Sequence, residues 1–350
     1  MLNNSDSLKT SGKRHIVFHI GPHKTGTTYI QKMCVEQRSI LAESGICYPR
    51  EGIGPQFGHH QIVRDLKQGN NSSLLRALEE CPPSHTVVFS SEDFDSFRQL
   101  QVKTLRDALP QDVMVSFVYF IRRQHELLIS SWQERTKSGG EQLWSEHFLK
   151  HIIRPFASPL LNHYVVLKHY GEVFGFENVH LVDYNYLVDE GTNVFDFLME
   201  YLGVRGLQKV SGFGKIINKS ISSVEAEILR ALNSLCKIRL VKPRHLSNNP
   251  KIRSVHSCFN LDQFKKEKHA LENIISQDMV NLEFNNLYFA SALQEFNQQQ
   301  LSSCIRATPS SEGEGAASYQ LPASSWIMKN QAVDHLEKLF QVIIKAAPQP

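Results

Sequence analysis

The sequence predicts an α/β protein: a three-layer, P-loop-like domain with a central, mostly parallel sheet, followed by a helical C-terminal extension. Short apolar runs alternate with segments of helical periodicity along the N-terminal two-thirds of the chain, which is typical of parallel strands joined by crossover helices. After about residue 220, apolar residues recur only at helical spacing. The 350 residues are 41% hydrophobic and 21% charged, which excludes a largely disordered chain or a collagen-like repeat.

Four buried strands are predicted, each an apolar run bounded by polar residues or glycine. They cover His15–Ile20, Thr86–Ser90, Val113–Ile121 and Asn178–Asp183. We expect one helix after the glycine turn that ends the first strand, another after the third strand, and a third over Val194–Leu202. Because such helices cover both faces of a parallel sheet, the strands should be buried on both sides.

The chain is expected to divide into four consecutive segments. Residues 1–14 form a polar N-terminal tail, and residues 15–300 form the α/β domain, which is helical from about residue 220. Residues 301–325, rich in Ser, Gly, Ala and Pro, are expected to be a flexible linker to a last helix over 326–350. The apolar stripe of that helix consists of Val333, Leu336, Phe340 and Ile343. It should dock on the chain's own core, and association of two copies through it is the alternative.

Composition bounds the partners and the compartment. The net charge of +3, from 38 basic and 35 acidic residues, does not indicate a nucleic-acid-binding protein. The charge is uneven, since residues 203–270 carry fourteen Lys or Arg against four Asp or Glu, and this basic segment suggests a local anion site. Six scattered cysteines without a Cys-x-x-Cys pair predict reduced thiols. No signal-peptide core or membrane-spanning apolar run occurs, so we expect a cytoplasmic protein.

The most informative segment is Gly21–Thr28, GPHKTGTT, where a buried strand turns into an amphipathic helix. Backbone N–H groups at a helix N-terminus are unpaired and point outward, so they bind phosphate or a similar anion. Gly26 can adopt the backbone conformation that wraps the anion, and Lys24 adds a full charge. Hydroxyl donors are supplied by Thr25, Thr27 and Thr28.

The order of residues in this turn differs from the two common nucleotide-binding motifs. A Walker A loop places Lys directly after its second glycine, whereas here Lys24 precedes Gly26 and Thr27 occupies the place of the Lys. A Rossmann G-x-G-x-x-G is also absent, because Gly21 and Gly26 are too far apart.

The segment Ile16–Gln31, IVFHIGPHKTGTTYIQ, resembles the 5′-phosphosulfate-binding loop of the sulfotransferase family, and it looks most like that of bacterial members related to carbohydrate sulfotransferases. These enzymes take the sulfuryl group from 3′-phosphoadenosine-5′-phosphosulfate (PAPS), a transfer that requires no metal. The resemblance implies that Lys24 to Thr28 bind the donor's 5′-phosphosulfate.

A second segment, Val118–Gln133, resembles the family's 3′-phosphate motif, an Arg at a strand end with a Ser eight residues later. Arg122 and Ser130 have that spacing. Arg122 ends a strand at the carboxyl edge of the sheet, where open α/β folds place ligands, and its planar guanidinium suits a phosphate.

A third, less specific match lies in the basic segment, over Ile217–Ser222 and the residues just before it. In related sulfotransferases a basic loop in this region closes over the 3′-phosphate and adenine. The resemblance implies that Lys215 and Lys219 make these contacts. It extends over roughly His15 to Leu232 in all.

Sulfuryl transfer needs a cation near the departing oxygen, donors around the equatorial oxygens, and a base for the acceptor hydroxyl. Lys24 is placed for the first role. Two candidates compete for the base: Glu92, which follows the second strand at the same sheet edge, and His60 of the His59-His60 pair. We favour Glu92 for its position on the sheet. No metal-ligand spacing such as His-Glu-x-x-His occurs.

The sequence therefore predicts a PAPS-dependent sulfotransferase that transfers the sulfuryl group to a hydroxyl or amine of a glycan or another small acceptor by in-line displacement. The rival is a P-loop kinase-like phosphotransferase, favoured by Asn178–Asp183, whose apolar run ending in Asp is typical of a Mg²⁺ strand. A non-catalytic nucleotide-binding module is the other alternative.

Overall fold

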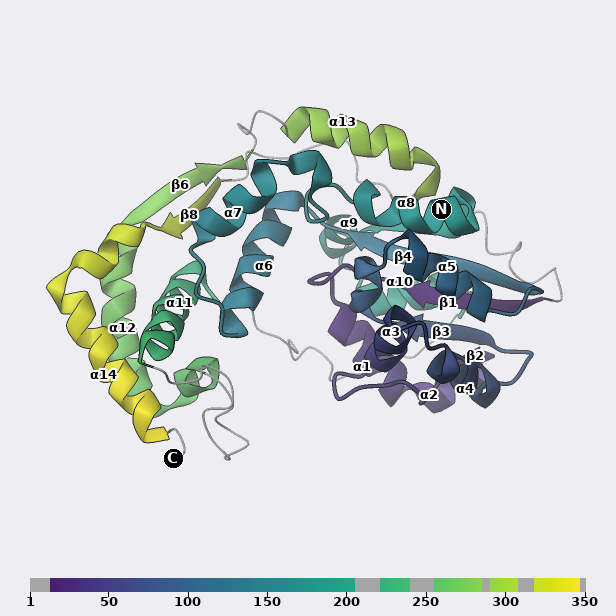
Figure 1. Cartoon of the computed structure of the whole chain (residues 1–350), viewed down its shortest axis with the longest axis horizontal. Coiled ribbons are helices and arrows are strands. Elements are labelled where there is room, and N and C mark those ends of the chain that lie inside the picture. Colours follow the sequence, from purple (N-terminus) through teal and green to yellow (C-terminus); the bar gives the residue numbers. More distant parts are fainter. Residues whose placement is uncertain (1–12, 205–220, 240–254, 285–289, 308–317, 347–350) are drawn as a thin grey trace. The chain divides into compact units, whose positions relative to one another are not determined.

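The structure is a computed structural model that describes residues 13–204, 221–239, 255–284, 290–307 and 318–346 (Figure 1). It divides into two compact units, each assembled from separate stretches of the chain. The first unit draws on Met1–Arg123, Phe156–Ile217 and Ala292–Gly313, and the second on Gln124–Pro155, Asn218–Ser291 and Glu314–Pro350. The units are therefore interleaved along the sequence, whereas we expected four consecutive segments.

The first unit is built on a six-stranded sheet with the strand order β2-β3-β1-β4-β5-β7, in which every neighbouring pair is parallel. The predicted strands appear as β1 (Arg14–His19), β3 (Thr86–Ser90), β4 (Val113–Ile121) and β5 (Val179–Asp183). The edges are formed by β2 (Ile46–Cys47) and β7 (Ile305–Ala307), which were not predicted. Two or three residues are too few to show a strand pattern.

Helices cover both faces of this sheet, because successive side chains of a strand point to opposite sides. Ile16 and Phe18 of β1 enter one buried cluster, whereas Val17 enters the other. The first cluster is completed by α3 (His60–Lys67), α4 (Ser72–Glu80), α5 (Gln99–Ala108) and α8 (Tyr164–Phe174). The second is completed by α1 (Thr27–Glu36), α2 (Arg38–Glu43), α9 (Tyr184–Asp189) and α10 (Val194–Tyr201). The predicted three-layer α/β fold is thus confirmed.

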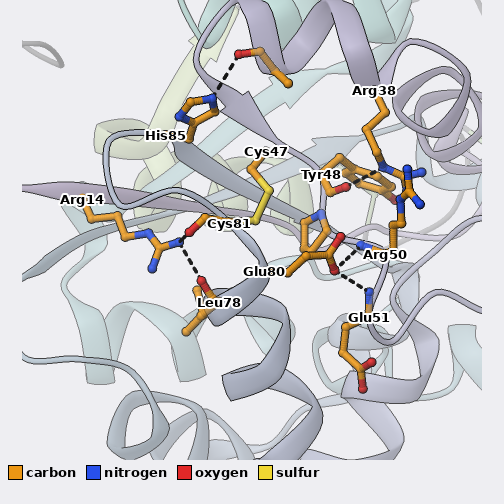
Figure 2. The surroundings of a disulfide bond; sticks show 12 residues. Arg14, Arg38, Cys47, Tyr48, Arg50, Glu51, Leu78, Glu80, Cys81 and His85 are labelled. Carbon is orange, nitrogen blue, oxygen red and sulfur yellow. Dashed lines mark hydrogen bonds between the residues drawn. A yellow bond between two sulfur atoms is a disulfide. The ribbon is translucent and has the colours of Figure 1, made fainter.

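Two of the six cysteines form a disulfide, so the prediction of six reduced thiols is wrong. Cys47 of β2 is bonded to Cys81, which follows α4 (Figure 2). The two are 34 residues apart, and β2 pairs with β3, the strand that follows Cys81. Disulfides are rare in cytosolic proteins, so this bond counts against the predicted cytoplasmic location.

A thiol count tests this pairing. The protein denatured without reductant should titrate four thiols and the reduced protein six, since Cys34, Cys236, Cys258 and Cys304 are buried and form no disulfide. The measurement is a colorimetric thiol assay after rapid acid quenching. Six thiols in both samples would contradict the bond.

The second unit is mainly helical. Its helices are α6 (Gln124–Lys137), α7 (Trp144–Ile152), α11 (Ser223–Ile238), α12 (Asp262–Ser276) and α14 (Asn330–Ala346). It also contains an antiparallel pair that was not predicted, β6 (Met279–Glu283) with β8 (Ser318–Pro322). Among the described residues, none of the helices is long and apolar enough to cross a membrane.

The C-terminal region differs in detail from the predicted linker and helix. Helix α13 (Ala290–Leu301) is followed by β7 and, after residues 308–317 (not described), by β8. The strands thus occupy parts of the stretch 301–325. In α14, Leu336, Phe340 and Ile343 are buried and the helix packs on α12, while Val333 is 45% exposed. Its stripe is therefore covered within the chain, and association of two copies through α14 stays a prediction.

The second unit contains a buried ion pair. Glu227 of α11 is 1% exposed; its carboxylate accepts two hydrogen bonds of 2.8 Å from Arg230 and one of 3.1 Å from the Trp326 indole. Removing one partner of a buried pair leaves an uncompensated charge, so Glu227→Ala should lower the free energy of unfolding by about 3–5 kcal/mol.

The matched control is the exposed pair of Arg239 with Glu337, at 2.8 Å. Exposed pairs contribute about 0–1 kcal/mol, so Glu337→Ala should have a small effect. Urea unfolding followed by tryptophan fluorescence measures both variants. Equal losses in the two would show that the buried pair is no more important than the exposed one.

Candidate active site

The turn between β1 and α1 lies at the carboxyl end of the sheet. Gly21, Lys24 and Gly26 all have positive φ angles, of 99°, 71° and 79°. A Cβ on Gly26 would come within 2.8 Å of the Val194 side chain, so this position requires glycine for both its backbone conformation and its space. Lys24 adopts a conformation that is costly for a residue with a side chain, as is common at ligand-binding sites.

Helix α1 starts at Thr27 with no side-chain cap and no acidic residue in its first turn. The first N–H groups with intrahelical acceptors are those of Tyr29 and Ile30, which both donate to the Gly26 carbonyl. The N-terminus therefore keeps its partial positive charge, which favours an anion. The Thr25 hydroxyl, predicted to meet that anion, instead donates to the Pro22 carbonyl at 2.8 Å and closes the turn.

Arg122 directly follows β4, and its side chain reaches this turn. Its Nη1 donates to the Lys24 carbonyl at 2.7 Å, and its guanidinium carbon lies 5.3 Å from the centre of the Tyr184 ring. Neighbouring Arg123 instead forms an ion pair with Asp189, at 3.4 Å. Of the two arginines, Arg122 is the one that the fold directs to the turn.

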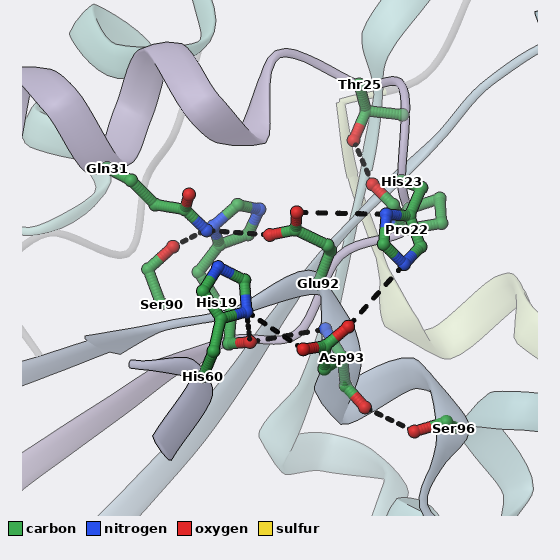
Figure 3. A network of polar contacts seen from close by, with 11 residues as sticks. His19, Pro22, His23, Thr25, Gln31, His60, Ser90, Glu92, Asp93 and Ser96 are labelled. Atoms are coloured by element: carbon green, nitrogen blue, oxygen red, sulfur yellow. Dashed lines mark hydrogen bonds and ion pairs between the residues drawn. The ribbon is translucent and has the colours of Figure 1, made fainter. Parts of the chain in front are cut away.

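Glu92 lies against the same turn, at the end of β3. A Cβ on Gly21 would be 3.3 Å from the Glu92 backbone, so the turn and the carboxylate are in contact. Glu92 is 8% exposed. Its Oε2 accepts a hydrogen bond of 2.8 Å from Gln31 of α1, and its Oε1 lies 3.7 Å from Nδ1 of His23 (Figure 3). The buried carboxylate is thus held by two residues of the turn and its helix.

His60 is joined to Asp93, the residue after Glu92. Its Nδ1 lies 2.9 Å from Asp93 Oδ2 and 2.9 Å from Ser91 Oγ (Figure 3). The hydrogen bond that His60 donates to Asp93 raises the pKa of His60 and lowers the pKa of Asp93. His23 Nε2 lies 3.8 Å from the other Asp93 oxygen, so one network connects the glycine turn, both carboxylates and His60.

Three polar atoms around Glu92 are buried and have no partner within the described structure. They are His19 Nε2, Gln31 Oε1 and His60 Nε2. Buried polar groups in folded proteins are almost always hydrogen-bonded to protein, water or ligand. These atoms therefore mark a place where a bound water or a polar group of a ligand fits.

Buried histidines make the first unit sensitive to acid. Burial lowers the pKa of His19 and of His59 to about 3, below the 6.5 of an exposed histidine. The unfolded chain therefore binds these protons more readily, and stability falls as the pH drops below 6.5 towards 3. Each histidine should lower the free energy of unfolding by about 2 kcal/mol between pH 7 and pH 5.

Urea unfolding of the wild-type chain at pH 7 and pH 5 measures this loss. His19→Asn and His59→Asn should each flatten the pH dependence by that amount, whatever they do to stability at pH 7. An unchanged slope in both variants would contradict neutral burial of these histidines.

The remaining predicted contacts stay predictions. Ser130 lies on α6 in the second unit, where its hydroxyl donates to the Leu127 carbonyl at 3.3 Å, while Arg122 belongs to the first. The Arg122 and Ser130 pair therefore stays a prediction. Lys215 and Lys219 lie outside the described residues.

Four residues of the network were missed by the sequence interpretation: His23, Gln31, Asp93 and Asp95. Gln31 follows Thr27 by four positions on α1, so helical spacing could have placed it on the face of the turn. Asp95 follows in the same 3₁₀ turn as Glu92, and burial raises its pKa to about 7. An acidic run at a strand end is the signal that could have drawn attention to these carboxylates.

Comparison with known proteins finds similar solved structures. No family model matches the chain, and no curated protein matches its sequence significantly. A sulfotransferase from Alicyclobacillus acidocaldarius is similar, with 17% identity and a TM-score of 0.37, over 54% of this chain and 80% of its own. A retinol dehydratase in complex with androsterone and the inactive cofactor PAP is also similar, with 12% identity and a TM-score of 0.29, over 97% of this chain and 82% of its own.

Proposed function

We propose that the chain is a sulfotransferase that uses PAPS as donor and a hydroxyl or amine of a glycan or another small molecule as acceptor. The observation that carries the proposal is the convergence of an uncapped helix N-terminus, Lys24 and Arg122 on one turn, with buried Glu92 in contact with it. The first three suit an anionic donor. The carboxylate suits a proton acceptor beside it.

In this proposal the residues of the turn bind the 5′-phosphosulfate, with backbone N–H groups and Lys24 stabilising the charge that develops on the departing oxygen. The S–O bond to the donor phosphate breaks as the acceptor oxygen bonds to sulfur, and the acceptor proton passes to the base. Positioning and charge stabilisation dominate such transfers. Arg122, joined to the Lys24 carbonyl, is proposed to bind the 3′-phosphate.

Glu92 is the better candidate for the base, and His60 is the second. The Asp93 hydrogen bond raises the pKa of His60 and so favours its protonated form, which cannot accept a proton. Glu92 also accepts a hydrogen bond from Gln31, which leaves its other carboxylate oxygen to act as the proton acceptor. A glycan as acceptor follows from the family resemblance alone.

The kinase alternative rested on Asp183 as a Mg²⁺ ligand. In the structure Asp183 Oδ1 accepts the Tyr186 N–H at 3.0 Å and caps α9, which gives this residue a structural role. The position of Lys24 before Gly26 also speaks against a Walker A loop.

Thermal-shift measurements test the proposal. Adenosine 3′,5′-bisphosphate should stabilise the wild-type protein more than Mg²⁺-ATP does, and Lys24→Ala should lose this stabilisation. Stabilisation by Mg²⁺-ATP alone would favour the kinase alternative. Binding of the bisphosphate without transfer from PAPS to any member of a panel of hydroxyl and amine acceptors would favour a non-catalytic module.

A further inference from the structure

A second place in the first unit is suited to an anion. A cavity of about 630 Å³ lies beside the Cys47–Cys81 disulfide, and its walls include Arg38, Arg50 and Tyr48 (Figure 2). Cavities of this size hold ligands of the size of a sugar or a nucleotide. The cavity shares no lining residue with the glycine turn or with the network around Glu92.

The guanidinium group of Arg38 and the backbone of Arg50 are each held by a hydrogen bond. Nε of Arg38 donates to the Tyr48 carbonyl at 2.9 Å, and its guanidinium carbon lies 6.0 Å from the centre of the Tyr48 ring. The N–H groups of Arg50 and Glu51 both donate to Glu80 Oε2, at 2.8 and 3.0 Å. The disulfide joins the residue before Tyr48 to the residue after Glu80, and so ties these two anchors together.

The two carboxylates that line the cavity, Glu36 and Glu80, have other partners, and the charge of Glu80 also acts on Arg38. Within the described part of the chain, Arg38 and Arg50 make no salt bridge with an acidic side chain. Glu36, by contrast, lies 3.5 Å from Lys32, and Glu80 accepts the two backbone N–H groups. Burial, and then the positive charge of Arg50, lower the pKa of Arg38, so the two cations repel each other, while the carboxylate of Glu80 raises it. An anion between them would relieve this repulsion.

We propose that this cavity binds the sulfate or phosphate monoester group of a sugar-sized ligand, held by the forked donors of Arg38 and Arg50. Either ester group presents three terminal oxygens that can accept from two guanidinium groups at once, and such charge-assisted hydrogen bonds are about twice as strong as neutral ones. The volume left around the two arginines accommodates the organic part of the ester. This site does not depend on the proposed function, because it shares no residue with the donor turn.

Calorimetric titration of the oxidised full chain tests the proposal, with glucose 6-sulfate, glucose 6-phosphate and inorganic sulfate as probes. The titrations are made in the Lys24→Ala background, so that the glycine turn does not contribute. We expect one ester per chain to bind, and Arg50→Gln to weaken this binding about tenfold or more, the effect of losing a charged hydrogen bond. The more tightly bound of the two sugar esters identifies the source of the anion.

Arg106→Gln is the matched control, since Arg106 lies on α5, which packs on the opposite face of the sheet from α2. The side chain of Arg50 is exposed and its loss should leave the fold intact, which a melting curve checks. Arg38→Lys, which keeps the charge but loses the fork, should weaken binding as well. The proposal is overturned if neither ester binds, if Arg50→Gln and Arg106→Gln bind equally well, or if inorganic sulfate binds as tightly as the esters.

Discussion

Lys24→Ala should reduce the rate of sulfuryl transfer from PAPS about 10²–10³-fold, the usual effect of removing one donor from the charge-stabilising set of an active site. Lys24 lies in the turn that precedes the uncapped N-terminus of α1, and Arg122 holds its carbonyl at 2.7 Å. The substitution should lower kcat as well as kcat/KM, because the charge on the departing oxygen develops in the transition state. Transfer of radiolabelled sulfate from PAPS measures it.

Lys32→Ala is the control for this variant. Lys32 lies on α1, 3.5 Å from Glu36, and its substitution by Ala also removes one positive charge but leaves the turn unchanged. Turnover should then stay within about twofold, as for most surface substitutions. If Lys24→Ala and Lys32→Ala had the same activity, the turn would not be the donor site.

Glu92→Gln should lower kcat about 10²–10⁴-fold, the usual contribution of a general base. The substitution keeps the shape of the side chain, and the amide oxygen can still accept the hydrogen bond from Gln31. The variant should therefore fold and bind adenosine 3′,5′-bisphosphate like the wild type. Steady-state rates of sulfuryl transfer at pH 7 measure the effect.

His60→Gln separates the two candidate bases. His60 contacts Asp93 and Ser91 and is joined to Glu92 through the His23 network, so its loss should lower the rate less than Glu92→Gln does. Full turnover in Glu92→Gln together with a large loss in His60→Gln would transfer the role of base to His60.

The central strands were predictable because each is a buried run with polar or glycine boundaries. The bounds of β3 and β4 are as predicted, and that of β1 differs by one residue at each end. In such runs the need to bury both faces shows directly in the sequence. By contrast, β6 has no buried residue, and β6 and β8 pair across a long stretch of chain, so no local pattern marks them.

The site was predictable where it depends on local sequence and not where it depends on packing. Lys24 and Gly26 belong to a continuous turn, whose strand-to-helix context suffices to indicate an anion site. The contacts of Gln31 with Glu92 and of Asp93 with His60 join residues 61 and 33 positions apart. Such contacts follow from the strand order, which the sequence does not state. The pairing of Cys47 with Cys81 escaped prediction for the same reason.

The short strands at the two edges of the sheet also bear on aggregation. β4 reads VMVSFVYFI, an apolar and β-branched run of the kind that stacks with copies of itself when exposed. In the fold it pairs with β1 on one side and β5 on the other, so its backbone groups are engaged on both sides. The edges instead present β2, with two residues, and β7, with three, which offer a neighbouring chain little to pair with. Another chain can therefore pair with β4 only after β1 or β5 has separated from it.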